Sequence, residues 1–175
     1  MKTTWSVDPS HSEVTFKVKH MMISTVTGIM KEFSINAETE GDDFSNANVK
    51  FAGKTASINT GNADRDAHLG SEEFFDAKKY PEITFNSTAM EKQDDQTYHM
   101  IGDLMIRGIT KKVDLDVDFG GTNKDPWGNT KAGFSVKGKI NRKDFGLAWN
   151  TVLETGGVMV SDEVRIACEI EMTRS

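Results

Sequence analysis

The sequence has little that could cross-link the chain or divide it into separate parts. Cys168 is the single cysteine among 175 residues, so no intramolecular disulfide can form, and three prolines and no low-complexity linker interrupt the chain. Because a chain of this length can bury most of its unfolded surface in one core, we predict a single domain over residues 1–175. Cys168 keeps the alternation of its apolar neighbours, which predicts a buried side chain rather than a reactive thiol.

Long apolar runs and positive charge are also scarce. No window of about 18 apolar residues is present, and residues 1–20 contain neither the apolar segment nor the cleavage site of a secretory leader. The net charge of −6 opposes the attraction that nucleic acid or an anionic membrane would need. We therefore predict no integral membrane segment and no nucleic-acid partner. The expected compartment is the cytoplasm, with a periplasmic or secreted protein as the alternative if a leader was removed before Met1.

Motifs that assemble catalytic or metal centres are missing as well. The chain contains no G-x-S-x-G, H-E-x-x-H, C-x-x-C, P-loop or G-x-G-x-x-G motif. Its four histidines are scattered without metal-ligand spacing. Asp114, Asp116 and Asp118 alternate with apolar residues, as the solvent-facing side of a strand would. We predict no catalytic residue, no metal and no cofactor.

What the sequence does contain is strict alternation of apolar and polar residues in eight runs separated by turn residues, which predicts eight β-strands. The apolar members of the runs are Val14, Phe16 and Val18; Ile29, Phe33, Ile35 and Ala37; Val49 and Phe51; Ile83, Phe85 and Ala89; Met100, Leu104 and Ile106; Val113, Leu115, Val117 and Phe119; Ala132, Phe134, Val136 and Ile140; and Val164, Ile166, Cys168, Ile170 and Met172. Eight amphipathic antiparallel strands can close into a barrel that holds one small ligand. A two-sheet sandwich is the alternative, but strands this long favour the barrel.

Residues 61–85 are the one stretch that does not follow this alternation. A short polar run there is followed by an amphipathic piece that carries Leu69, Phe74, Phe75 and Tyr80. Functional groups concentrate on irregular segments that a rigid scaffold holds in place. We therefore predict a short helical insertion near residues 63–79 that forms a lid or a mouth on the barrel.

Two polar residues fall on the apolar face of their runs. His20 has the parity of Val18, and Arg142 has the parity of Ile140, so both should point inward, where polar groups need partners or water. In an up-and-down barrel the odd-numbered strands all end at one rim, which is where these runs, the insertion and the turn after the fifth run lie. One mouth should therefore gather the following candidate head-group residues: His20, Arg65, Asp66, His68, Arg107 and Arg142.

Structural roles for the same residues stay open at this point. His20 can be a satisfied rim histidine, and the Arg65–His68 run can be a capped, solvated loop. Arg142 can pair with Asp66 or Asp144 and hold the barrel together, since an inward arginine needs a counter-charge.

Six ordered motifs carry a resemblance to a known family. They are W-S-V-D-P-S-H-S from Trp5, F-K-V-K-H-M from Phe16, R-D-x-H-L from Arg65, F-F-D-A-K-K-Y-P-E-I-T-F from Phe74, G-D-L-M-I-R-G-I-T-K from Gly102 and I-N-R-K-D-F-G-L from Ile140. Together they resemble the YceI-like family from Trp5 to near the C-terminus. The resemblance implies an extended, lipocalin-like, eight-stranded antiparallel barrel with an apolar tunnel that binds a polyisoprenoid or similar amphiphile. It also implies a homodimer and no agreed catalytic activity.

The expected function is the non-enzymatic binding, storage or transport of a long-chain isoprenoid or related lipid. The lipid tail is expected among inward apolar residues: Phe16, Val18, Phe33, Phe51, Phe85, Leu104, Leu115, Phe134 and Val136. Two alternatives stay open. One is a hydrolase or transferase that acts on a lipid head group, with His20 or His68 as general base and Arg142 holding an oxyanion. The other is a ligand-free stress or structural protein.

Overall fold

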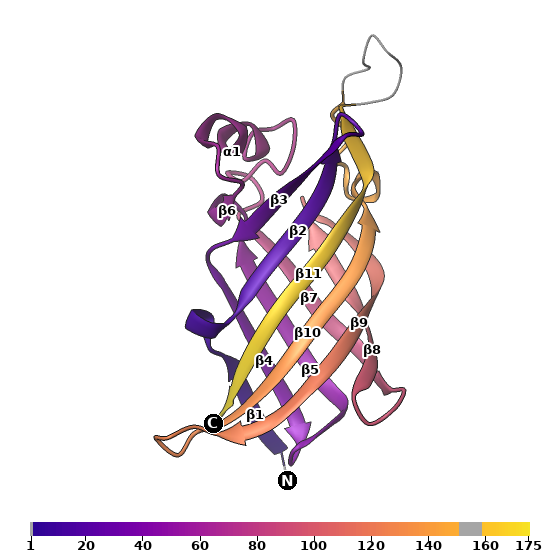
Figure 1. Ribbon diagram of the computed structural model, residues 1–175. Coiled ribbons are helices and arrows are strands. Elements are labelled where there is room, and N and C mark those ends of the chain that lie inside the picture. Colours follow the sequence, from indigo (N-terminus) through magenta and orange to yellow (C-terminus); the bar gives the residue numbers. More distant parts are fainter. Residues whose placement is uncertain (1, 151–158) are drawn as a thin grey trace.

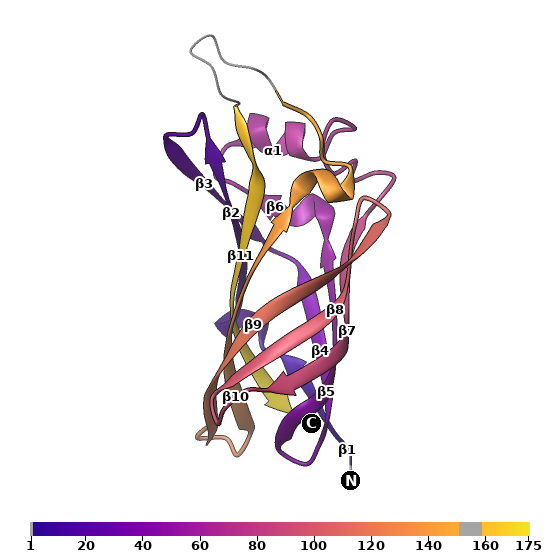
Figure 2. The same ribbon diagram turned by 90° about the vertical axis from the view of Figure 1, so that its right-hand side faces the viewer.

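The computed structural model describes residues 2–150 and 159–175, which form an elongated β-barrel (Figures 1 and 2). The strands are β1 (Lys2–Val7), β2 (Glu13–His20), β3 (Ser24–Met30), β4 (Phe33–Glu40), β5 (Asp43–Lys54), β6 (Ile58–Asn59), β7 (Glu82–Lys92), β8 (Thr97–Ile106), β9 (Ile109–Lys124), β10 (Thr130–Asn141) and β11 (Val160–Arg174). The helices are α1 (Ala63–Leu69) and three 3₁₀ helices: η1 (Pro9–His11), η2 (Thr55–Ser57) and η3 (Arg142–Phe145).

Closure of the barrel depends on the pairing of β1 with β11. The strand order β1-β4-β5-β7-β8-β9-β10-β11 returns to β1 through that pair, and every pairing in it is antiparallel. Above β1, the same edge of β11 pairs with β2, and β3 pairs with β2 and with the short β6. β1 with β2, and β3 with β4, therefore act as two long interrupted strands. The predicted eight-stranded antiparallel barrel is confirmed.

The two interruptions shift the phase of the alternation. β3 and β4 were expected as one continuous strand with Ile29 and Phe33 on the inner face. The two residues between β3 and β4 turn the chain. As a result, the side chains that face the interior lie at even-numbered positions in β3 and at odd-numbered positions in β4. Met30 is buried and lines the interior, whereas Ile29 does not line it. The inward placement of Ile29 was wrong for this reason.

The predicted short helical insertion near residues 63–79 is confirmed, with its helix over Ala63–Leu69 and tight turns beyond it. Asn62 caps the start of α1 by accepting a hydrogen bond from the backbone N–H of Arg65. Gly70 ends the helix, and Asp76 adopts a left-handed φ of 48° within the turns that follow. The turns carry the chain back over the barrel end to β7.

The barrel has two different ends. Both termini lie at the lower end, and the insertion, η3 and the turn between β2 and β3 lie at the upper end (Figure 1). The rim prediction followed from the up-and-down order of the strands, and that order holds in the closed ring.

Candidate functional site

A cavity of about 250 Å³ runs inside the barrel. Inward side chains of nearly every strand line it, and among the described lining residues Thr15 and Arg142 alone are of polar type. A cavity of about 150 Å³ with this kind of lining stays dry and admits benzene. The interior therefore favours an apolar guest over water.

The predicted tail residues can be compared with this lining. All of them except Phe33 line the cavity: Phe16, Val18, Phe51, Phe85, Leu104, Leu115, Phe134 and Val136. Phe33 stacks on Phe51 instead, with ring centroids 6.3 Å apart. It sits at the start of β4, next to the interruption that turns the chain. Contact of these residues with a lipid tail stays a prediction.

An aromatic cluster closes the lower end of the cavity. The ring of Phe44 packs on Trp5, Phe119 and Phe134 with centroids 5.0, 5.4 and 4.8 Å apart. Trp5 also donates a hydrogen bond from Nε1 to Thr39 Oγ1 at 2.9 Å. Phe44 and Phe134 line the cavity, whereas Trp5 and Phe119 lie behind them. Packed aromatic rings therefore fill the barrel at its lower end.

Phe44 was missed by the sequence analysis. Val49 and Phe51 occupy odd positions, so Phe44 had the wrong parity for the inner face. Asn46 adopts a left-handed φ of 62°, which shifts the phase of β5 and turns Phe44 inward. The residues next to Asn46 in the sequence do not indicate such a shift.

Glycines on neighbouring strands make room for the largest lining side chains. A Cβ atom added at Gly28 would lie 2.2 Å from Phe16 Cζ, and one added at Gly102 would lie 2.5 Å from Phe85 Cζ. Such distances are sterically impossible, so each ring lies directly over a glycine. The calibre of the cavity therefore depends on the pairing of large and small residues across strands.

The upper end is covered by a second aromatic group. The ring of His68 in α1 meets Phe74 and Trp149 edge to face, each at 5.0 Å, and Phe74 and Trp149 are 5.3 Å apart. His68 Nε2 also contacts the carboxylate of Glu73. Phe74 lines the cavity, whereas His68 does not. This group is the roof of the cavity.

Arg142 is buried, with 3% of its surface exposed, at the upper end of the cavity wall. Its Nε donates to the Ser161 carbonyl at 2.9 Å, and Nη1 donates to the carbonyls of Leu147 and Trp149. Nη2 donates to the Val160 carbonyl at 3.3 Å and lies 3.7 Å from Asp162 Oδ1. Burial lowers the pKa of Arg142, and the charge of Asp162 opposes that shift.

The partner of Arg142 is therefore Asp162, rather than Asp66 or Asp144 as the sequence suggested. The hydrogen bonds of Arg142 join the segment after η3 to the start of β11. The role of Arg142 in holding a ligand head stays a prediction.

The other predicted cations also bond to the chain. Arg65 donates from Nε to Thr60 Oγ1 and from Nη2 to the Thr60 carbonyl, both at 2.7 Å, and Asp66 Oδ1 accepts from the same threonine. Arg107 donates to the carbonyls of Gly146 and Glu72, both at 2.8 Å. These contacts fasten the insertion and the β8–β9 turn to the barrel.

The six candidate head-group residues thus lie at one end but do not form an open ring of free cations. His20 ends β2 opposite Val160 and does not line the cavity. Arg142 is the one member of the set that reaches the cavity wall among the described residues.

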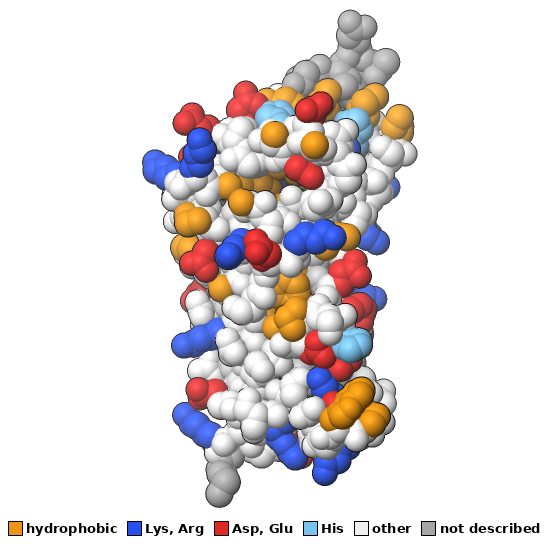
Figure 3. Space-filling view, turned by 90° about the vertical axis from the view of Figure 1, so that its left-hand side faces the viewer, with side chains coloured by type: hydrophobic (Ala, Val, Ile, Leu, Met, Phe, Trp, Pro, Cys, Tyr) orange, Lys and Arg blue, Asp and Glu red, His pale blue; other side chains and the backbone are white. Residues whose placement is uncertain are grey.

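A second pocket of about 290 Å³ lies between the insertion and the barrel. It shares Ile58, Leu69 and Phe75 with the main cavity and adds the polar groups of Thr55 and Asp66. Figure 3 views the molecule from the α1 side and shows hydrophobic side chains just below its upper end. The sequence analysis did not find this pocket, because it arises from contacts between distant segments.

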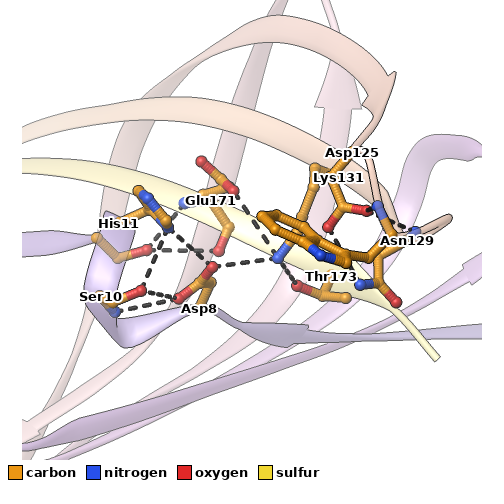
Figure 4. Close-up of polar contacts among 10 residues, drawn as sticks. Asp8, Ser10, His11, Asp125, Asn129, Lys131, Glu171 and Thr173 are labelled. Carbon is orange, nitrogen blue, oxygen red and sulfur yellow. Dashed lines mark hydrogen bonds and ion pairs between the residues drawn. The ribbon is translucent and has the colours of Figure 1, made fainter.

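A polar cluster fastens the interruption between β1 and β2 (Figure 4). Asp8 accepts hydrogen bonds from the backbone and hydroxyl of Ser10, and its Oδ2 lies 3.0 Å from His11 Nδ1 and 3.1 Å from Lys131 Nζ. These hydrogen bonds, with Ser10 first, hold the pKa of Asp8 well below its usual range. The pKa of His11 is raised, chiefly by its hydrogen bond to Asp8.

Asp8, His11 and Glu171 each offer a ligand atom within 4.8 Å of the others, which is a spacing that a metal ion could use. Lys131 Nζ, however, lies 3.1 Å from Asp8 and 3.9 Å from Glu171. An ammonium group in that position competes with any cation for the same oxygens. The cluster is better described as a fastening of β1, η1, β10 and β11.

Cys168 lies on β11 and lines the cavity. Burial raises the pKa of its thiol to about 11. A thiol with so high a pKa is not activated as a nucleophile. Its environment matches the sequence expectation of an apolar role.

Among the described residues, no helix is long and apolar enough to cross a membrane.

Comparison with known proteins gives one family. The family model of the YceI-like domain matches residues 5–172. The UPF0312 protein SA2479 of Staphylococcus aureus (strain N315) is 36% identical over 174 residues, which cover 99% of both proteins. The crystal structure of the Campylobacter jejuni YCEI protein is 38% identical, with a TM-score of 0.78 over 90% of both chains.

A more distant solved structure has the same fold. The polyisoprenoid binding domain from Saccharophagus degradans has a TM-score of 0.69 over 98% of both chains, at 14% identity. That likeness shows the fold alone. The family match and the curated relatives span nearly the whole sequence, and the protein therefore belongs to the YceI-like domain family.

Proposed function

We propose that the protein binds a long-chain isoprenoid or a related amphiphilic lipid, without catalysis, and carries or stores it with the tail inside the barrel. The observation that carries this proposal is the cavity of about 250 Å³ with an almost entirely apolar lining. Burial of an apolar tail contributes about 25 cal/mol per Å² of buried surface, which offsets the costs of association. The Saccharophagus degradans domain, which is described as polyisoprenoid binding, has the same fold and supports the choice of lipid.

In this proposal the polar head of the lipid lies at the upper end. The lower end is closed by the aromatic cluster around Phe44, so a tail that enters from above leaves its head among the predicted residues. These residues are His20, Arg65, Asp66, His68, Arg107 and Arg142. The homodimer and the cytoplasmic compartment stay predictions of the sequence.

The wall of the cavity provides the test. Phe16→Trp and Phe134→Trp each add bulk to the lining, and overpacking of this size should weaken the binding of a long-chain polyprenol by roughly tenfold. Competition with a fluorescent long-chain polyene measures the change in Kd. Phe33→Trp is the matched control, because Phe33 does not line the cavity.

Circular dichroism should show that all three variants keep the strand signal. Unchanged affinity in both cavity variants would mean that the tail lies elsewhere. A loss in Phe33→Trp as large as in the other two would point to a general effect of the substitution on the fold.

The alternative of an enzyme that acts on a lipid head group rests on the pair formed by His68 and Glu73. Neither residue lines the cavity, so in our proposal the pair positions the roof rather than attacking a ligand. Turnover of a prenyl or acyl substrate by the purified protein, lost in His68→Ala, would favour the enzyme.

A further inference from the structure

The turn between β2 and β3 exposes three large apolar side chains in succession. Met21, Met22 and Ile23 are 38, 59 and 80% exposed. Among the described residues, the other large apolar side chains exposed to this degree are Ile109 and Trp127. We call Met21–Ile23 the hairpin tip.

The backbone of the hairpin tip is unusual for such residues. Met21 and Met22 adopt left-handed φ angles of 54° and 61°, a region that asparagine, aspartate and glycine normally occupy. The turn is held by hydrogen bonds from the Ile23 N–H to the His20 carbonyl and from the Met21 N–H to the Met159 carbonyl. Large apolar side chains are thus presented to solvent where small polar residues would fit the backbone better.

The charge of the hairpin is opposite to that of the protein. Between Glu13 and Glu32 the chain has Lys17, Lys19 and Lys31 and no acidic residue, although the net charge of the protein is −6. All three lysines are exposed. The nearest acids on the adjoining part of β11 are already paired: Asp162 with Arg142 and Lys143, and Glu163 with Lys139 and Arg165.

The hairpin tip lies at the upper end of the molecule, beside the start of β11 (Figures 1 and 2). His20, which precedes the tip, pairs with Val160, and both Val18 and Val160 line the cavity. Trp127 is 84% exposed in the β9–β10 turn, which lies at the lower end. The tip therefore lies next to strand residues that line the upper part of the cavity.

A lipid bilayer fits this surface better than a second copy of the chain. Three side chains supply much less than the surface of about 800 Å² per partner that a stable protein interface buries. A few apolar side chains flanked by lysines are, in contrast, the usual combination in peripheral membrane contacts, because the apolar groups enter the interface and lysines attract anionic head groups.

We propose that the hairpin tip inserts into an anionic lipid bilayer and that ligand passes between the bilayer and the cavity at this point. The transfer step rests on the proposed function, whereas the docking step does not. Lys17 and Lys19, on β2 below the tip, hold the tip against the head groups and orient the otherwise acidic protein.

Co-flotation with vesicles tests the docking step. Vesicles of phosphatidylcholine with phosphatidylglycerol should carry the wild-type full chain, and Met22→Ser/Ile23→Ser should reduce the bound fraction at least about tenfold, because each lost apolar contact removes roughly that factor. Trp127→Ser is the matched control at the closed end and should float like the wild type. Absence of wild-type flotation, or equal flotation of the tip variant, would overturn the proposal.

Two further measurements separate the steps. Uptake of a polyprenol from vesicles should slow in the tip variant, while binding of the same polyprenol added from ethanol should be unchanged. If the wild type binds no polyprenol from either source, the proposed function fails, and flotation still decides docking. If the substitutions instead turn a dimer into a monomer in light scattering and vesicle binding is absent, the tip is an interface between copies and the membrane proposal is overturned.

Discussion

At Arg142, a charged guanidinium group is buried in the barrel wall and each of its nitrogens faces an oxygen of the chain. Four of these oxygens are backbone carbonyls of residues 147, 149, 160 and 161, and the fifth belongs to Asp162. A guanidinium group that already makes four hydrogen bonds to carbonyls and one ion pair has little capacity left for a ligand. The contacts favour a structural role for Arg142 over the head-group role that its position on the inner face suggested.

Removal of Arg142 should therefore cost stability. Arg142→Ala leaves several carbonyls at this site without their donor and Asp162 with Lys143 as its remaining partner, which should lower the free energy of unfolding by about 3–5 kcal/mol. Urea denaturation measures the change. Arg165→Ala is the matched control, because that side chain is 67% exposed on β11 and its loss should stay within about 0.5 kcal/mol.

The head-group role predicts a different pattern for the same variant. If Arg142 holds the head, Arg142→Ala should keep wild-type stability and weaken an anionic prenyl phosphate far more than the neutral alcohol. Equal losses of affinity for both ligands, together with a lower free energy of unfolding, would instead support the structural role of Arg142.

At the scale of elements, the first two long strands are each interrupted, and the first interruption is fastened by the cluster around Asp8. The Asp8 side chain caps η1 by accepting from the Ser10 N–H and also reaches Lys131 on β10. β10 pairs with one edge of β11, and β1 and β2 pair with the other edge. The contacts of Asp8 therefore link the strands on the two edges of β11. Alternation in the sequence did not predict β1, because η1 separates its short run from the next one.

The lowered pKa of Asp8 links this fastening to pH. A carboxyl group whose pKa is lower in the folded state stabilises the fold above its unfolded pKa of about 3.9, and this contribution is lost as the pH falls further. The pKa of His11 is raised, so its contribution is present below an unfolded pKa of about 6.5 and fades as the pH rises through the folded value.

Asp8→Ala should remove both the cap and the ion pairs. We expect a loss of about 1 kcal/mol near neutral pH, which lowers Tm by about 2–4 °C in a chain of this size. The difference from the wild type should shrink below about pH 4, where the Asp8 carboxylate begins to be protonated in the unfolded chain. Thermal unfolding from pH 3 to 7 measures this dependence.

Asp42→Ala serves as the control. Both side chains of the ion pair between Asp42 and Arg174 are exposed, so this pair should contribute little to the stability of the fold. A constant Tm difference for Asp8→Ala across the whole pH range would contradict the ionic part of the account.

The prediction of inward residues from alternation succeeded or failed within individual strands. Parity placed Phe16, Phe85, Leu104 and Leu115 on the inner face, because each lies in an unbroken stretch of strand. It failed where the chain turns between strands, as at Ile29, or where a left-handed residue shifts the phase, as for Phe44. Such shifts depend on one or two backbone angles that the pattern of apolar residues does not record.

At the scale of the whole molecule, the strand order alone brought the predicted head-group residues to one end. The up-and-down topology depends on the order of the strands in the closed ring. An error of a few residues in the bounds of one strand therefore does not change it. The bonding partners of those residues were not predictable, because alternation does not record which carbonyls fold back onto a side chain: those of Glu72 and Gly146 for Arg107, and those of the segment after η3 and of the start of β11 for Arg142. The upper end is therefore more tightly fastened and less cationic than the sequence suggested.

The whole barrel thus has a closed lower end, an apolar interior and an upper end built from the insertion and η3. This shape suits a guest that is apolar along most of its length and polar at one end. We expect such a guest to occupy the cavity.

Native mass spectrometry of the protein, purified without detergent, tests this occupancy. We expect a protein species that carries one lipid mass, or that gains one after incubation with a long-chain polyprenol, and Phe16→Trp should reduce that species relative to Phe33→Trp. A spectrum with the bare chain mass alone, before and after incubation, would instead indicate a ligand-free barrel.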